Sequence, residues 1–430
     1  MRELFPRFFK ENMAYFPGMK KKRFKIETLG CRTNQYESQA FADQLTGVGF
    51  SEAHEGEQAD LCIINTCTVT DSADKRSLYQ IRKLEREHPG APIYVTGCMA
   101  ERRASEILKL SPQARVIPNK EKETLLTYAL PDETLPEFSI KRFEAHTRAF
   151  VKVQDGCNSF CSYCIIPYVR GRSRSKPIDL VLKEIHDLVD NGFKEVVLTG
   201  INIGDYEDGL ANLVRAVDKI DGIERIRISS IDPDEVDDDL LDAVISGKKT
   251  CPSMHIVLQA GSNKVLKRMN RKYTREDFFH TTERLVAANP DFTFTTDIIV
   301  GFPGETEEDF QDTLDAMKEV RFAKVHMFPF SVRPGTRAAR FTDFVAEEVK
   351  AERKQTLMRL SERIGYNLRE QYIGKTMKVL VEDNNTGHTE NFLSVTISDQ
   401  DVLQNQIYDV EIVENSPEGL RGVVCQYASL

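Results

Sequence analysis

The chain has 430 residues, 40% hydrophobic and 29% charged, and a formal net charge of −9. This length allows two or three domains of ~100–200 residues each, and the sequence has neither a run of ~18 apolar residues that could span a bilayer nor a secretory signal. We therefore expect a cytoplasmic protein with no membrane partner, whose cysteines are more typical of metal binding or catalysis than of disulfides.

The acidic net charge by itself argues against a nucleic-acid partner, and we expect no contact with DNA. Phosphate binding needs only a local basic face, however. One basic patch is distinctive because Arg170, Arg172 and Arg174 alternate with Gly and Ser directly after a cysteine-rich loop. This spacing predicts a flexible cationic lip beside a candidate site.

Residues 1–22 are expected to form an N-terminal extension, in which Met19 is an alternative start. From 23 to 130 the pattern predicts an α/β domain with a parallel sheet, because short apolar runs alternate with helical segments. Ser72 is expected to cap the helix Ala73–Glu87. The apolar runs are Phe24–Glu27, Leu61–Ile64 and Ile93–Val95.

A cysteine follows each of these three strands: Cys31, Cys67 and Cys98. The carboxyl ends of parallel strands share one edge of a sheet, and ligands bind there. The three thiols are therefore expected to lie along one edge despite their separation in sequence. The residues alone leave two interpretations open, a three-thiolate metal site or three separate buried cysteines.

Residues 131–148 are typical of a linker, and the strand–helix alternation then restarts. About six β/α units between 149 and 344 predict a partial (β/α)6 barrel of the TIM type, whose chemistry belongs at the strand carboxyl ends. The expected strands are Phe150–Gln154, Glu195–Gly200, Ile223–Ser230, His255–Gln259, Phe292–Val300 and Lys324–Phe330.

The loop after the first of these strands carries Cys157, Cys161 and Cys164 in the spacing C-x3-C-x2-C. Iron–sulfur clusters are held by thiolates, and three thiolates would leave one iron of a four-iron cluster open. A structural zinc site is the alternative, but zinc usually takes four protein ligands, and no fourth Cys or His lies at loop distance.

Polar residues and glycines follow the other strands of the expected barrel. A glycine at a strand end lets the backbone approach a ligand closely. The candidates are Thr199, Gly200, Asn202, Ser230, Asp232, Gln259, Asp297, Gly301, Pro303 and Arg333.

The C-terminal part is expected to contain one connecting helix and one small domain. Residues 345–371 have helical periodicity, and residues 372–430 have strand-like runs separated by turn clusters. This pattern predicts a small antiparallel β-barrel.

The cysteine motif with Tyr163 before its last cysteine, followed by IIPYVRGRSRS, resembles the radical S-adenosylmethionine (SAM) methylthiotransferase family. The contexts TLGC, NTC and GC around Cys31, Cys67 and Cys98 also resemble this family. The resemblance covers the chain from about Arg23 to the end. It implies a tRNA or ribosomal-protein substrate and an RNA-binding C-terminal barrel of the TRAM type.

The same resemblance implies two 4Fe-4S clusters and SAM as cofactors. Cys157, Cys161 and Cys164 would hold the cluster that cleaves SAM, and the other three cysteines would hold an auxiliary cluster that carries sulfur. The strand-end candidates with Tyr163 would bind SAM, although many relatives have Glu where Asp232 stands. Arg170, Arg172, Arg174 and Arg333 would bind substrate, Arg333 through a carboxylate.

The segments TLGCRTNQYES and LTGINIGDY look most like the bacterial branch that methylthiolates C2 of N6-threonylcarbamoyladenosine, adenosine 37 beside the tRNA anticodon. The resemblance also implies an external electron donor and a sulfur source. Three alternatives remain open: another tRNA adenosine, a ribosomal-protein side chain, or a non-enzymatic iron–sulfur or zinc RNA-binding protein.

Overall fold

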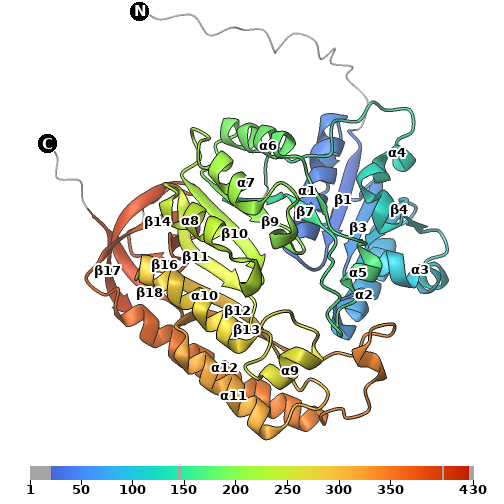
Figure 1. Cartoon of the computed structure of the whole chain (residues 1–430). Coiled ribbons are helices and arrows are strands. Elements are labelled where there is room, and N and C mark those ends of the chain that lie inside the picture. Colours follow the sequence, from blue (N-terminus) through green and yellow to red (C-terminus); the bar gives the residue numbers. More distant parts are fainter. Residues whose placement is uncertain (1–20, 144–146, 400, 426–430) are drawn as a thin grey trace, which may run out of the picture.

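The computed structural model describes residues 21–143, 147–399 and 401–425, which form three folded parts and one long helix (Figure 1). Nearly all of the expected extension, Met19 included, lies outside these residues, as do residues 426–430 of the expected C-terminal domain. None of the described helices combines the length and apolarity needed to cross a bilayer.

The N-terminal part is a five-stranded parallel sheet in the order β2-β1-β3-β4-β5. Its central strand is buried along its whole length, as expected for a parallel strand covered on both faces. The elements are β1 (Arg23–Thr28), α1 (Arg32–Gly47), β2 (Ser51–Glu52), β3 (Leu61–Thr66), α2 (Asp71–Glu87), β4 (Ile93–Gly97), α3 (Cys98–Leu110), β5 (Arg115–Val116), η1 (Asn119–Thr124) and α4 (Leu125–Ala129).

Helix α2 begins earlier than expected, and Ser72 does not cap it. Thr70 has the extended backbone of an N-cap, and its hydroxyl accepts a hydrogen bond from the Ala73 N–H at 3.1 Å. Ser72 already lies inside the helix, where it cannot satisfy the free N–H groups of the first turn.

The central part is an open parallel sheet of six strands in the order β13-β12-β11-β10-β9-β6. Alternating helices cover it, which agrees with the predicted (β/α)6 pattern. Its elements are β6 (Arg148–Lys152), β7 (Gln154–Asp155), α5 (Ile166–Val169), β8 (Arg174–Ser175), α6 (Ile178–Asp190), β9 (Glu195–Thr199), η2 (Ile203–Asp205), α7 (Leu210–Val217), β10 (Arg225–Ile231), η3 (Pro233–Glu235), α8 (Asp238–Ser246), β11 (Thr250–Ile256), α9 (Asn263–Arg268), α10 (Arg275–Ala288), β12 (Thr293–Val300), α11 (Glu307–Glu319) and β13 (Phe322–Pro329).

Strand β11 begins at Thr250 and ends at Ile256, so both of its ends come earlier than in the expected strand His255–Gln259. Pro252 lies within this strand, and the pairing of β11 with β10 is irregular between Ile228↔Met254 and the preceding partners. Such irregularities tolerate proline, because no ladder N–H is needed at that point. Gln259 therefore lies beyond the strand, with a left-handed φ of 64°.

The C-terminal part is a closed five-stranded barrel in the order β14-β15-β16-β18-β17. The predicted barrel is not wholly antiparallel, because β16 and β18 pair in parallel. Short runs separated by turns do not reveal which strands finally pair. The elements are η4 (Ala338–Arg340), α12 (Glu347–Glu370), β14 (Thr376–Asp383), β15 (Thr386–Thr389), β16 (Ser394–Ile397), β17 (Ile407–Asn415) and β18 (Leu420–Val424).

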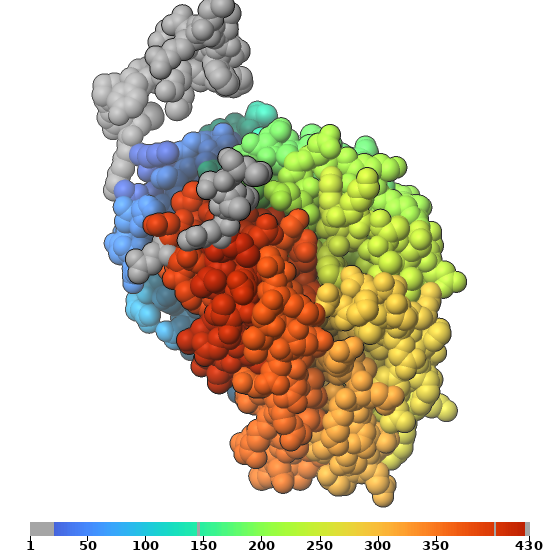
Figure 2. Space-filling model, turned by 90° about the vertical axis from the view of Figure 1, so that its left-hand side faces the viewer, coloured from blue at the N-terminus to red at the C-terminus, as the bar shows by residue number. Residues whose placement is uncertain are grey.

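Two buried arginines of β10 attach the barrel to the central sheet. Arg225 donates hydrogen bonds to the carbonyls of His388 and Lys378 at 2.9 and 2.8 Å, and Arg227 donates to those of Thr389 and Glu390 at 2.8 Å. In Figure 2 the orange-red C-terminal segment lies between the blue N-terminal part and the green and yellow central part.

Candidate active site

Cys31, Cys67 and Cys98 lie at one edge of the N-terminal sheet. Cys67 and Cys98 directly follow β3 and β4, and Cys31 is the third residue after β1. Register pairs Thr28 with Asn65 and Thr66 with Gly97, so the three strand ends are level. A Cβ on Gly30 would lie 3.1 Å from the sulfur of Cys67, which brings the Cys31 loop against Cys67. Parallel-strand geometry therefore gathers residues that are distant in sequence.

The thiols of this first triad (Cys31, Cys67 and Cys98) influence one another electrostatically. Burial, together with Cys98 and Cys31, raises the pKa of Cys67 to about 12. Burial also raises the pKa of Cys98, and Cys31 adds to the shift. A bound metal removes this cost, because a coordinating thiol is deprotonated outright.

The second triad (Cys157, Cys161 and Cys164) lies on the loop between β7 and α5. Gly156 starts the loop with φ +75°, and a Cβ there would lie 2.0 Å from the carbonyl oxygen of Arg172. The Cys157 N–H donates to the Gly171 carbonyl at 3.2 Å. Burial raises the pKa of Cys157, and burial with Cys161 raises that of Cys164 to about 12.

The segment after α9 fixes the middle of this loop. The Ser162 N–H donates to the Met269 carbonyl at 2.8 Å, and the Asn270 side chain donates to the Phe160 carbonyl at 3.1 Å. Arg271 donates directly to the sulfur of Cys161 at 3.0 Å. Hydrogen bonds to cluster-ligating sulfur are one means by which proteins tune iron–sulfur clusters.

Helix α5 joins the two triads. Ile165, the N-cap of α5, directly follows Cys164, and Ile165 and Val169 pack in one buried cluster with Cys98. Asn119 of the N-terminal part donates to the Val169 carbonyl at 2.8 Å. The two sets of thiols therefore face the same interface between the N-terminal and central parts.

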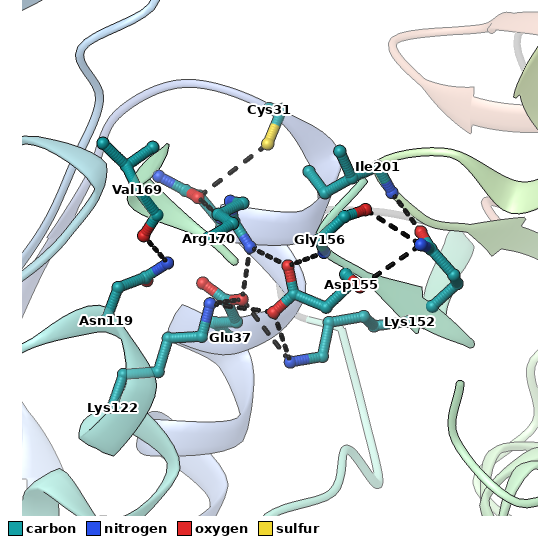
Figure 3. A network of polar contacts seen from close by, with 12 residues as sticks. Cys31, Glu37, Asn119, Lys122, Lys152, Asp155, Gly156, Val169, Arg170 and Ile201 are labelled. Atoms are coloured by element: carbon teal, nitrogen blue, oxygen red, sulfur yellow. Dashed lines mark hydrogen bonds and ion pairs between the residues drawn. The ribbon is translucent and has the colours of Figure 1, made fainter. Parts of the chain in front are cut away.

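A buried network of charges lies at this interface (Figure 3). Arg170 is 3.1 Å from Glu37 and 2.7 Å from Asp155, and Lys122 and Lys152 approach the same carboxylates. Burial opposes ionisation of Glu37, yet Arg170, Lys122 and Lys152 lower its pKa to about 2. The network joins α1 to the loop of the second triad.

This network corrects the prediction of a cationic lip at Arg170. Its side chain is fully buried and neutralised, and it also bonds Asn34, the residue to which the Cys31 thiol donates at 3.8 Å. Arg172 is exposed and stacks 4.4 Å from the Phe160 ring. Arg174 pairs with Asp155 at 2.7 Å and remains half exposed. Sequence spacing did not show that the first arginine turns inward.

Arg333 also differs from its hypothesised role. It lies buried after β13, 2.8 Å from the carboxylate of Asp74 on α2, and donates to the Thr68 carbonyl at 3.2 Å. Arg333 is thus already ion-paired within the protein, although Asp74 is shared with Arg103 at 3.1 Å, and these contacts do not favour it as a ligand of a substrate carboxylate.

The loop after β9 is shaped by Gln154. Its side-chain oxygen accepts hydrogen bonds from the N–H groups of Ile201 and Asn202, both at 2.9 Å, while a Cβ on Gly200 would lie 2.9 Å from it. The Asn202 amide donates to Glu235 at 2.8 Å. Burial and Asp232 raise the pKa of Glu235 to about 7. Thr199 ends β9 and is buried.

Asp232 follows β10 and is ion-paired with Arg271, the residue that contacts Cys161. Burial raises the pKa of Asp232, although Arg271 opposes the shift. Ser230 is half-buried two residues earlier. Glu235 and Arg271 were missed by strand-end reasoning, because neither ends a strand; their proximity arises only from packing.

The loop after β12 reaches the second triad through aromatic side chains. Tyr163 and Phe302 have ring centroids 6.3 Å apart in an edge-to-face arrangement. Gly301, at φ +68°, donates its N–H to Glu305 at 2.7 Å, and Pro303 is buried beside them. Asp297 lies earlier on β12, 3.5 Å from the Nε2 atom of His255.

These residues fit the cofactors that the family resemblance implies. The side-chain oxygen of Gln259 is buried with no hydrogen-bond partner among the described residues, as expected where a polar ligand is to bind. Within residues 21–143, 147–399 and 401–425, no three His, Cys, Asp or Glu surround a single metal ion. A four-iron cluster takes thiolates on different irons, so its ligands are spaced more widely.

Comparison with known proteins decides the family. The pattern of the Radical SAM superfamily matches residues 151–317, and that of "Uncharacterized protein family UPF0004" matches residues 23–118. A Chlamydia pneumoniae protein named "Threonylcarbamoyladenosine tRNA methylthiotransferase MtaB" is 49% identical over 93% of this chain and 98% of its own. The chain belongs to the radical SAM tRNA methylthiotransferases. Enzymes of this family use 4Fe-4S clusters and SAM.

The methylthiotransferase is also 36% identical to a Thermodesulfovibrio yellowstonii protein named "tRNA-2-methylthio-N(6)-dimethylallyladenosine synthase", over 94% of this chain and 99% of that one. Among solved structures it resembles the radical SAM methyltransferase TsrM from Kitasatospora setae, with a TM-score of 0.56 and 14% identity, over 84% of this chain and 78% of that one. The latter likeness shows the shared fold.

Proposed function

We propose that this methylthiotransferase modifies C2 of N6-threonylcarbamoyladenosine, adenosine 37 beside the anticodon of tRNA. The assignment of this substrate rests on the 49% identity, across almost the whole of both chains, to the relative named for threonylcarbamoyladenosine. The relative named for dimethylallyladenosine is 36% identical over a similar length. The two triads at one interface support a reaction that needs two clusters.

Each triad is assigned one cluster. Cys157, Cys161 and Cys164 would hold a four-iron cluster with one iron left for SAM, while Cys31, Cys67 and Cys98 would hold the auxiliary cluster. When bound, the clusters and SAM supply the electron, the radical and the sulfur. The proposed reaction also needs an electron donor and a sulfur source from outside the chain.

The chain's own residues would orient SAM and exclude water. Gln154 shapes the loop that would carry the SAM amino group, and the Tyr163–Phe302 pair gives the adenine an apolar surface. Arg172 and Arg174 are sufficiently exposed to contact tRNA phosphates. The remaining proposed SAM contacts are Thr199, Gly200, Asn202, Ser230, Asp232, Gln259, Asp297, Gly301 and Pro303.

The test is an anaerobic assay with reconstituted enzyme, SAM, a reductant and two tRNAs, one with threonylcarbamoyladenosine and one with dimethylallyladenosine. Mass spectrometry of the digested nucleosides is expected to find the methylthio group on the first. A Cys157→Ala variant should leave both tRNAs unmodified. Modification of the dimethylallyl tRNA alone, or of a purified ribosomal protein instead, would refute the proposal.

A further inference from the structure

A cavity of about 680 Å³ lies where the three parts of the enzyme meet. It is lined by Arg32 from the N-terminal part, by β11 to β13, by α12, and by the loop between β15 and β16. Sites for small molecules usually measure ~300–1,000 Å³. The cavity is therefore large enough for one nucleoside with a substituent.

Arg32 is the guanidinium that the N-terminal part contributes to this cavity. It directly follows Cys31 and stacks 5.5 Å from the Phe150 ring. In the part of the chain that the structure describes, no carboxylate or carbonyl is bonded to Arg32. Asp297 is the carboxylate that interacts electrostatically with Arg32, but it lies 3.5 Å from His255 and forms no ion pair with Arg32.

The other cations that line the cavity, Lys324, Lys354 and Arg369, form no ion pair among the described residues either. Four guanidiniums outside the cavity do form ion pairs within the protein. Two of them belong to the central sheet, and two belong to the interface with the triads. The pairs are Arg148–Glu382 at 3.1 Å, Arg227–Glu195 at 2.6 Å, Arg170–Glu37 at 3.1 Å and Arg333–Asp74 at 2.8 Å.

Arg32 also occupies an unfavourable place for a cation. It is the first residue of the sixteen-residue helix α1. The partial positive charge of a helix N-terminus favours anions there and disfavours cations. Neither an ion pair nor the helix dipole stabilises this charge within the protein. The side chain is exposed, so it is open to water and to an anionic ligand in the cavity.

We propose that Arg32 binds the carboxylate of the threonylcarbamoyl group on the target adenosine; this inference rests on the proposed function. The planar guanidinium can bond both carboxylate oxygens at once. C2 and C6, the carbon that carries the substituted N6, belong to the same six-membered ring, so a base whose C2 faces the first triad carries its substituent nearby. A dimethylallyl group has no carboxylate, so a contact with Arg32 would not increase its affinity.

The test measures equilibrium binding of two anticodon stem-loop RNAs to the reconstituted holoenzyme. One carries threonylcarbamoyladenosine, and the other carries its primary amide, in which the carboxylate is neutral. The wild type is expected to bind the acid about 10- to 100-fold more tightly, the difference made by a bidentate charged contact. Arg32→Gln should bring the two affinities to the same value, and Arg32→Lys should keep part of the difference.

Lys354 supplies the matched control, because it lines the same cavity from α12. Lys354→Gln is expected to weaken the binding of both RNAs equally and to leave the ratio of acid to amide affinity unchanged. Iron content is measured for each variant, since Arg32 adjoins Cys31. An unchanged ratio in Arg32→Gln, or no discrimination by the wild type, would overturn the assignment. Wild-type modification of the dimethylallyl tRNA alone would instead refute the proposed function.

Discussion

Arg170 of the central part and Glu37 of α1 form an ion pair of 3.1 Å in which neither side chain is exposed. The pair crosses the interface that carries both cysteine triads. Asp155 shares the same guanidinium and directly precedes Gly156, which opens the loop of the second triad. The relative position of the two triads therefore depends on charges that water does not reach.

Arg170→Met is expected to destabilise the protein by about 3–5 kcal/mol, because it leaves two buried carboxylates without their main partner. Urea unfolding of the full chain measures the change. Arg172→Met is the control, since Arg172 is exposed on the same segment and should change stability by less than about 0.5 kcal/mol. Equal effects of the two substitutions would contradict the role given to the network.

Acid should weaken the same interface through Glu37. Its pKa falls from 4.5 to about 2 in the folded protein, so ionised Glu37 contributes stability that is complete above pH 4.5 and is lost as the pH falls toward 2. Unfolding free energies of metal-free wild type and Glu37→Gln, measured between pH 6 and pH 2.5, check this. The wild-type curve should fall more steeply below about pH 4.5; parallel curves would refute the prediction.

Gly156→Ala should remove the second cluster while leaving the first. The added Cβ would lie 2.0 Å from the Arg172 carbonyl, and φ is +75°, so the loop must move. Iron is expected to fall from about eight to about four atoms per chain, as two four-iron clusters become one. Gly171→Ala is the matched control, because Gly171 also has a positive φ, +81°, but a Cβ there would meet only open space. Iron loss in both variants would show that strain, not the clash, is responsible.

The cysteine triads could be predicted from the sequence because each depends on a local rule. Cys157, Cys161 and Cys164 share one loop, and parallel strands that end level bring Cys31, Cys67 and Cys98 to one edge. The alternation of strands and helices likewise predicted the two parallel sheets. The barrel was predicted as a barrel, but the parallel pairing of β16 and β18 was not.

The side-chain pairs across domains could not be predicted. Arg170 and Glu37 are 133 residues apart, and the partner of Arg333 lies on α2. No local period or spacing encodes how two domains dock, and only docking decides which cations are neutralised. This is why the sequence favoured Arg333 as a substrate ligand, whereas the structure leaves Arg32 without an internal partner.

The attachment of the C-terminal barrel has a consequence for synthesis on the ribosome. Arg225 and Arg227 are buried within the central sheet, yet their acceptors are carbonyls of residues 378 and 388–390. Those acceptors leave the ribosome more than 150 residues after the arginines. Glu195 of the same sheet accepts a hydrogen bond from Arg227, but a buried guanidinium with some of its N–H groups unpaired is still costly. The central sheet therefore reaches its final packing only after nearly the whole chain has been made.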